Sequence, residues 1–183
     1  MAPGLTGIVG GRPKVSPRIC LFSCLVPKQS VQPTVQINNE CFPVTVPAGE
    51  AFATATNSDA ESIPVPATDT TVPLIALAWA RSGDKGNHAN IGVIARKTAF
   101  VPYLRAALTE RAVAQWMQHV LDPDTGKVTR WELPGFDAFN FLLANSLGGG
   151  GIASLRIDPQ GKAFAQQLLD FPVPIPASIA QSL

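Results

Sequence analysis

The sequence has little charge, and its charges nearly cancel. Only 15% of the 183 residues are Asp, Glu, Lys or Arg, and the formal net charge is +1. A chain with this balance has no general electrostatic attraction for nucleic acid or for an anionic membrane surface. Hydrophobic residues make up 46% of the chain, which is enough to build a core. We therefore expect a globular protein with no nucleic-acid partner and no membrane partner.

Long hydrophobic runs are also missing. The longest clean run, residues 74–80, is far shorter than the roughly 20 residues of a membrane-spanning helix. It is apolar at every position, which is typical of a central strand that is buried on both faces.

Cysteine is scarce, and the number of cysteines is odd. Cys20, Cys24 and Cys41 occur in a chain whose start does not look like a secretory signal peptide. This favours reduced thiols and a cytoplasmic location over a disulfide framework. The histidines, His88 and His119, lie far along the chain from the cysteines. We therefore expect no metal site, and no motif indicates a bound cofactor.

Signatures of catalysis are equally thin. The G-x-S-x-G elbow and the G-x-x-x-x-G-K-[ST] phosphate loop are both absent. His88 follows Asp84 by four residues and has the chemistry of a general base, although a lone histidine in a loop is usually just solvated. We assign no catalytic residue, and the sequence leaves open whether the chain is an enzyme.

Proline divides the chain. Ten of the 17 prolines lie in residues 1–73. Within this part, residues 34–46 show an extended pattern around Asn38-Asn39, which predicts a β-hairpin. Residues 48–71 are rich in Ala, Thr, Ser and Pro and have no apolar period, which predicts a flexible linker.

Residues 72–176 carry regular apolar patterns and are expected to form a separate domain, with a tail at 177–183. The predicted strands are 74–80, 90–96, 128–133 and 153–157, and the predicted helices are 102–108, 109–120, 137–145 and 160–169. The first two strands have no helix between them. This order predicts an α+β fold with helices packed on one face of a mixed or antiparallel sheet.

The most polar segment, A-R-S-G-D-K-G-N-H-A-N at residues 80–90, joins the first two predicted strands. Gly83 and Gly86 allow backbone conformations in which successive N–H groups point inward and bind an anion. Asp84 would repel that anion unless the Arg or Lys of the segment pairs with it. A tight turn stabilised by its own side chains explains the same residues, and residue chemistry alone favours the turn.

Two further features have both a structural and a functional interpretation. Gly148 to Gly151 could let a ligand approach the backbone, but glycines after a predicted helix more often form its C-cap and a hinge. Asn140 could orient a ligand or a loop, or it could simply lie on a helix surface. The pattern Arg156-x-Asp158-Pro159-x-Gly161-Lys162 contains a helix-start signal and is more typical of structure than of catalysis.

Several separated motifs together resemble the C-terminal domain of the acyclic terpene utilisation (AtuA-like) proteins. They are residues 80–86 with 89–92, Leu133-Pro134-Gly135, Asn140-Phe141, residues 147–151, and Arg156-x-Asp158-x-x-Gly161-Lys162. The resemblance covers about residues 72–176 and implies a ferredoxin-like sandwich. Residues 1–47 are similar to the end of the family's large N-terminal domain, and most of that domain is missing from this sequence.

The resemblance also implies a function. Such a domain is expected to be a small ligand-binding or assembly domain associated with acyclic terpene or branched acyl-CoA catabolism, without catalysis of its own. The alternatives are an acyl-CoA-processing enzyme that uses the 81–90 loop, or a truncated inactive fragment. The partners that it implies are acyl-CoA or another anionic ligand, a large AtuA-type domain on another chain, and further copies of this chain.

With the resemblance in view, we expect the polar segment and the glycine run to lie close together at one end of the sheet and to form a polar binding site for a ligand anion or for a partner domain. Its predicted residues are Arg81, Ser82, Gly83, Asp84, Lys85, Gly86, Asn87, Asn90, Asn140, Gly148, Gly149, Gly150 and Gly151.

Overall fold

The computed structural model describes residues 15, 17, 19–20, 22–51, 67–133 and 135–183. The described residues of 21–62 form one compact unit, and those of 63–183 form a larger one. The middle of the predicted linker, residues 52–66, lies outside the described residues. No helix in the described part of the chain combines the length and the apolar character that a membrane crossing requires.

The smaller unit contains the predicted hairpin. Strand β1 (Thr34–Ile37) pairs antiparallel with β2 (Glu40–Pro43), after a short 3-10 helix, η2 (Lys28–Ser30). Asn38 takes a positive φ of 52° in the turn, a conformation that asparagine tolerates better than most residues. The hairpin prediction is confirmed. Every residue of both strands is exposed, so the hairpin buries no core of its own.

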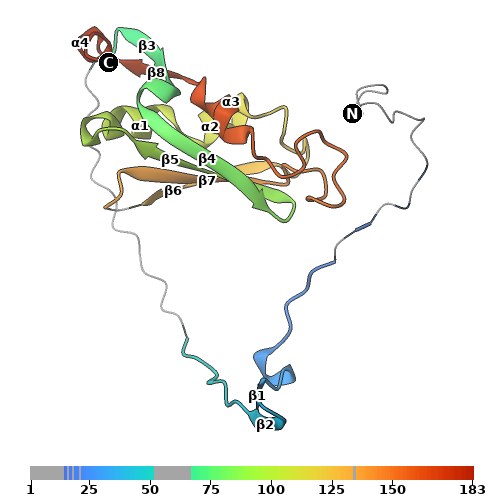
Figure 1. Ribbon diagram of the computed structural model, residues 1–183. Coiled ribbons are helices and arrows are strands. Elements are labelled where there is room, and N and C mark those ends of the chain that lie inside the picture. The colour runs from blue at the N-terminus through green and yellow to red at the C-terminus, as the bar shows by residue number, and fades with distance from the viewer. Residues whose placement is uncertain (1–14, 16, 18, 21, 52–66, 134) are drawn as a thin grey trace. The chain divides into compact units, whose positions relative to one another are not determined.

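The larger unit is built on a four-stranded antiparallel sheet in the order β4-β5-β7-β6 (Figure 1). The strands are β4 (Ala78–Lys85), β5 (His88–Ala95), β6 (Lys127–Leu133) and β7 (Ala138–Ala144). Each pair of neighbouring strands is antiparallel. The α+β class predicted from the sequence is confirmed, and the sheet is of the antiparallel kind.

The helices of this unit lie on one side of the sheet (Figure 1). They are α1 (Val101–Ala107), α2 (Glu110–Trp116) and α3 (Phe164–Leu169), with the 3-10 helices η3 (Leu74–Ala76) and η4 (Thr98–Phe100). Ile91, Phe141 and Leu143 point from the sheet into the core against these helices and are fully buried. Thr109 caps α2: its Oγ1 accepts a hydrogen bond from Ala112 N at 3.1 Å.

A second, two-stranded sheet closes the unit. Strand β3 (Thr70–Pro73) pairs antiparallel with β8 (Pro172–Ile175), and the short helix α4 (Ala177–Ala180) follows. Ala177 N donates to Asp69 Oδ1 at 2.6 Å. The ordered unit therefore begins before the predicted boundary at residue 72, and the predicted tail at 177–183 contains a helix that packs on the core.

Three element predictions are wrong. Residues 74–80 form η3 and the start of β4, which is an edge strand and not a central one. Residues 138–144, within the predicted helix 137–145, form a strand and not a helix: they pair with β5 on one side and β6 on the other, and from Phe139 on buried and half-buried residues alternate with period two. Residues 153–157 are irregular: Leu155 and Ile157 are exposed, whereas Arg156 turns inward and donates to the carbonyl oxygens of Val120 and Ser146.

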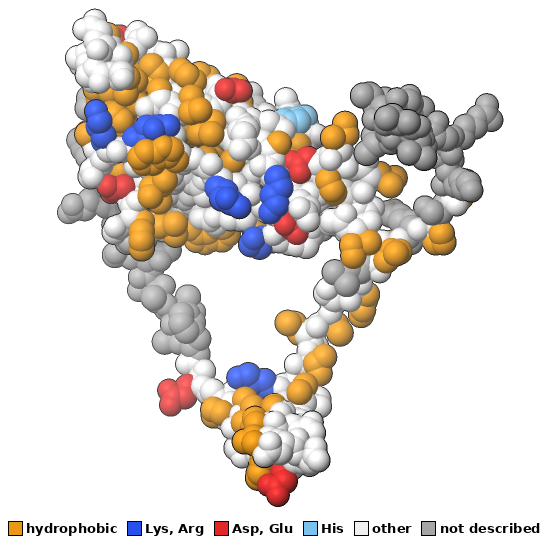
Figure 2. Space-filling model, viewed as in Figure 1, with side chains coloured by type: hydrophobic (Ala, Val, Ile, Leu, Met, Phe, Trp, Pro, Cys, Tyr) orange, Lys and Arg blue, Asp and Glu red, His pale blue; other side chains and the backbone are white. Residues whose placement is uncertain are grey.

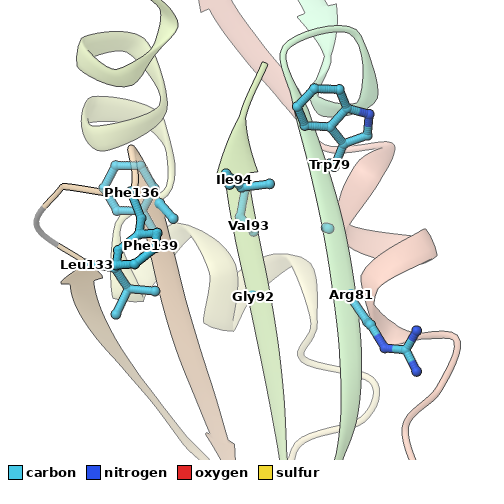
Figure 3. A pocket seen from close by; sticks show the side chains of 10 residues that line it. Trp79, Arg81, Gly92, Val93, Ile94, Leu133, Phe136 and Phe139 are labelled. Atoms are coloured by element: carbon cyan, nitrogen blue, oxygen red, sulfur yellow. The ribbon is translucent and has the colours of Figure 1, made fainter. Parts of the chain in front are cut away.

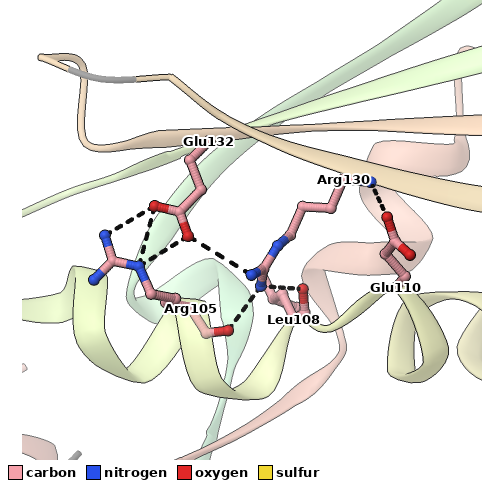
Figure 4. A network of polar contacts seen from close by, with 5 residues as sticks. All are labelled: Arg105, Leu108, Glu110, Arg130 and Glu132. Atoms are coloured by element: carbon pink, nitrogen blue, oxygen red, sulfur yellow. Dashed lines mark hydrogen bonds and ion pairs between the residues drawn. The ribbon is translucent and has the colours of Figure 1, made fainter. Parts of the chain in front are cut away.

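A network of charged side chains fixes α1 to the edge strand β6 (Figure 4). Arg105 of α1 donates to both carboxylate oxygens of Glu132 at 2.9–3.1 Å, and this hydrogen bonding raises the pKa of the Arg105 guanidinium. Arg130 donates to the carbonyl oxygens of Arg105 and Leu108 at 2.7 and 3.0 Å. Since these carbonyls end α1, Arg130 caps the helix from the sheet.

Candidate functional site

The polar segment at residues 80–90 is mostly strand and not loop. Its turn is limited to Gly86-Asn87, and the residues on both sides belong to β4 and β5. Gly86 has a positive φ of 64°, which a glycine adopts without strain. Because side chains alternate along a strand, successive residues of the segment face opposite sides of the sheet.

Ser82 faces the helices and is only 6% exposed. Its Oγ accepts a hydrogen bond from Ala165 N at 2.9 Å and donates one to Lys162 O at 3.2 Å. These two bonds join β4 to the start of α3, 80 or more residues away in sequence. Ser82, a predicted ligand residue, thus uses its hydroxyl proton and one acceptor lone pair within the fold.

The sequence suggested that Asp84 would pair with Arg81 or Lys85, but the structure shows neither pair. Its carboxylate faces Lys162 Nζ at 3.7 Å, and Lys85 Nζ instead donates to the Asp84 backbone carbonyl at 2.9 Å. The same Lys162 ammonium lies 3.2 Å from where a Cβ on Gly83 would be. Gly83 therefore leaves room for this lysine at the edge of β4.

The polar turn and the glycine run are in direct contact, as predicted. Asn87 Oδ1 accepts a hydrogen bond from Gly149 N at 2.6 Å. A Cβ on Gly150 would lie 3.0 Å from Gly86 O, closer than ordinary packing allows, and Gly150 also has a positive φ of 90°. The glycines permit this close approach of two backbones.

Around this contact, polar groups are bonded to one another. Asn87 Nδ2 donates to Asn145 Oδ1 at 3.2 Å, and Asn145 N donates to His88 Nδ1 at 2.9 Å. Gly148 is packed against the Arg156 side chain, whose Nε would lie 3.2 Å from an added Cβ. A backbone N–H of the glycine run is thus committed to Asn87. Ligand binding at this cluster stays a prediction.

The opposite face of the four-stranded sheet is not covered by a helix of the described chain (Figure 1). We call it the open face. From the registers of the strands, the residues that point to it are Trp79, Arg81, Gly83, Lys85, His88, Asn90, Gly92, Ile94, Lys127, Thr129, Trp131, Leu133, Ala138, Asn140, Leu142 and Ala144.

One end of the open face is apolar and hollow. A cavity of about 350 Å³ lies there, and Figure 3 shows Trp79 on one side of it, Leu133 and Phe136 on the other, and Ile94 and Gly92 between them. Trp79 is 52% exposed and Phe136 is 70% exposed. Gly92 has no side chain to fill the hollow, and a Cβ there would meet only Arg81 O, at 3.9 Å.

The middle of the open face carries neutral hydrogen-bonding groups. Asn90 Nδ2 donates to Asn140 Oδ1 at 3.3 Å across β5 and β7. Both side chains are half-buried, and each keeps further donors or acceptors. Asn140 lies in a strand and not on the predicted helix, so its neighbour on the sheet is Gly92.

The charges of the open face are all of one sign. It carries Arg81, Lys85 and Lys127, and none of its positions is Asp or Glu. Among the described residues, none of these three cations is in an ion pair. Figure 2 shows hydrophobic side chains gathered over one part of the larger unit, with Lys and Arg side chains beside them and farther along.

Comparison with known protein families gives a match that lies within the larger unit. A family model, the AtuA ferredoxin-like domain, matches residues 72–174. The chain belongs to this family. A search among curated proteins found no match, and a search among solved structures found none. The resemblance read from the sequence motifs is therefore confirmed at the level of the family and its ferredoxin-like domain.

Proposed function

We propose that this AtuA ferredoxin-like domain is a ligand-binding domain that holds an acyl group on its open face, in acyclic terpene or branched acyl-CoA catabolism. The observation that carries the proposal is the hollow over Gly92. Its volume of about 350 Å³ falls within the usual range of small-molecule sites, roughly 300–1,000 Å³. Its walls are aromatic and aliphatic, and they suit an apolar chain.

The polar groups of the 80–90 segment support binding without catalysis. The Ser82 hydroxyl is bonded on the helix side, and the Asp84 carboxylate faces Lys162. His88 Nδ1 accepts a hydrogen bond from the backbone of Asn145. Each of the three is thus engaged within the fold, which supports a binding role for the hollow over a catalytic one.

The test is titration with a branched, medium-chain acyl thioester of N-acetylcysteamine, which carries no phosphate. Trp79 and Trp131 point to the open face and serve as fluorescent reporters. Gly92→Leu should weaken binding by roughly tenfold or more, because hydrophobic pockets discriminate about tenfold for a single methylene group. The substitution should not unfold the sheet, since a Cβ there meets only Arg81 O, at 3.9 Å, and the rest of the side chain extends into the hollow.

Gly151→Leu is the matched comparison. A Cβ at Gly151 would meet nothing within 4 Å, but the residue belongs to the glycine run and not to the open face. Binding lost in Gly151→Leu and kept in Gly92→Leu would place the site at the glycine run and refute the proposal. Binding that neither variant changes would refute it as well.

An assembly role is a second candidate, and the smaller unit favours it. Val35 and Phe42 are opposite each other in the β1–β2 hairpin, and both are about half exposed. A two-stranded hairpin is marginally stable in water unless its apolar face is covered. Light scattering should find an oligomer whose mass falls in Val35→Asp. A wild-type chain that is monomeric at all concentrations would rule this role out.

A further inference from the structure

We infer that the Lys85 end of the open face is an anion subsite, which takes the phosphate-bearing end of an elongated ligand whose acyl end lies over Gly92. The inference rests on the proposed function, because it concerns the same ligand and the same face. It assigns a role to Lys85, His88 and Lys127.

The three side chains stand at the same end of the sheet. Lys85 is paired with His88 across β4 and β5, and Lys127 is paired with Ala144 across β6 and β7. Lys85 Nζ bonds to a neutral carbonyl, so its charge is not cancelled. Lys127 is exposed and, in the described part of the chain, has no ion-pair partner.

His88 presents a donor at this end. Its Nδ1 accepts the hydrogen bond from Asn145 N at 2.9 Å, so the neutral ring carries its proton on Nε2. That N–H is the remaining hydrogen-bonding group of the ring. Lys85 lies on one edge strand of the sheet and Lys127 on the other, so their ammonium groups stand on either side of this N–H and attract an anion to it. None of the open-face positions is Asp or Glu.

The spacing along β5 sets the length of the ligand. Gly92 and His88 are four residues apart, which is about 13 Å in an extended strand. Asn90 and Asn140 lie between the two ends and offer hydrogen bonds without charge. This order of surfaces suits a molecule with an apolar end, an amide-containing middle and a phosphate end. An acyl phosphopantetheine has this order, either in coenzyme A or attached to a carrier protein.

The experiment compares one acyl group in two forms: the coenzyme A thioester and the phosphate-free N-acetylcysteamine thioester. The coenzyme A form should bind about tenfold more tightly, because each exposed charge interaction contributes a factor of up to about five. The difference should shrink at high salt. The double variant Lys85→Gln/Lys127→Gln should remove it and leave the phosphate-free form unaffected. Arg111→Gln, an exposed cation on α2, is the matched control and should keep it.

A preference for the coenzyme A form that survives in the double variant would overturn the subsite. The proposed function would still stand in that case, provided that Gly92→Leu weakens the phosphate-free thioester. A third arm uses the acyl group on a carrier protein: tighter binding than coenzyme A, lost in the double variant, identifies the carrier as the source of the phosphate. If carrier and coenzyme A forms both bind as weakly as the phosphate-free form, the subsite is refuted.

Discussion

Ser82 and Arg81 are neighbours in sequence but point to opposite faces of β4, and they should respond to substitution in opposite ways. Ser82→Ala removes the acceptor of Ala165 N, which is fully buried, and the donor to Lys162 O. A buried N–H left without a partner costs about 1–3 kcal/mol. We expect a loss of about 2 kcal/mol in the free energy of unfolding. A domain of about this size shifts by roughly 4 °C in Tm per kcal/mol, so the expected fall is about 8 °C.

Urea unfolding followed by tryptophan fluorescence measures this loss, since all three tryptophans lie in the larger unit. Arg81→Gln should change stability by less than about 0.5 kcal/mol, as exposed positions usually do. Below its Tm, Ser82→Ala should still bind the acyl thioester normally. Equal stability of the two variants would contradict the buried role of the Ser82 hydroxyl. Selective loss of binding in Ser82→Ala would show that Ser82 belongs to the site and that the assigned faces are wrong.

Three further predictions concern other contacts. Arg156→Ala should lower the free energy of unfolding by about 2–4 kcal/mol in chemical denaturation, because it leaves the carbonyls of Val120 and Ser146 without their donor; an unchanged midpoint would mean that water replaces the guanidinium. Lys162→Met should cost no more than about 1 kcal/mol in the same assay, because its ion pair with Asp84 is largely exposed, and a larger loss would indicate that this pair holds α3 in place. Hydrogen bonds from Thr125 lower the pKa of Asp122. The stability that these bonds contribute should therefore be complete above about pH 4 and should fall as the pH drops through the lower pKa of the folded state. Acid unfolding of Asp122→Asn should lack this component, and an acid profile identical to that of the wild type would contradict the assignment.

Elements that depend on local chemistry could be predicted from the sequence. The helix that Thr109 begins and the Asn38-Asn39 hairpin each depend on residues within a few positions of one another. Strand β7 was predicted to be a helix because aspartate, here Asp137, is a common N-cap residue. In the structure Asp137 Oδ2 instead accepts a hydrogen bond from Thr98 Oγ1 at 2.6 Å. The pairing of β3 with β8 joins residues about 100 positions apart, and no local sequence pattern predicts such a contact.

The candidate site was also predicted only in part. The contact between the polar turn and the glycine run was correctly predicted, but from the resemblance, which links the two segments, and not from residue chemistry, which favoured a simple turn. The open face was not predicted. Which side chains reach it depends on the register of β4 against β5, and that register is fixed by placing the turn at Gly86-Asn87. The role of Lys162 could not be foreseen either, because Lys162 reaches Asp84 from the start of α3.

The β3–β8 pair also determines how this domain responds to mechanical force. Thr70 is opposite Ile175, and Pro73 is opposite Pro172, so the chain enters and leaves the domain on two antiparallel neighbours at one corner (Figure 1). Tension applied through the two flanking segments therefore opens this pair like a zipper, one residue pair after another, and does not shear it. The four-stranded sheet that carries the open face is separate from this pair. We therefore expect α4, which follows β8 and packs on the core, to detach first, then the β3–β8 pair to open, and the four-stranded sheet to yield last.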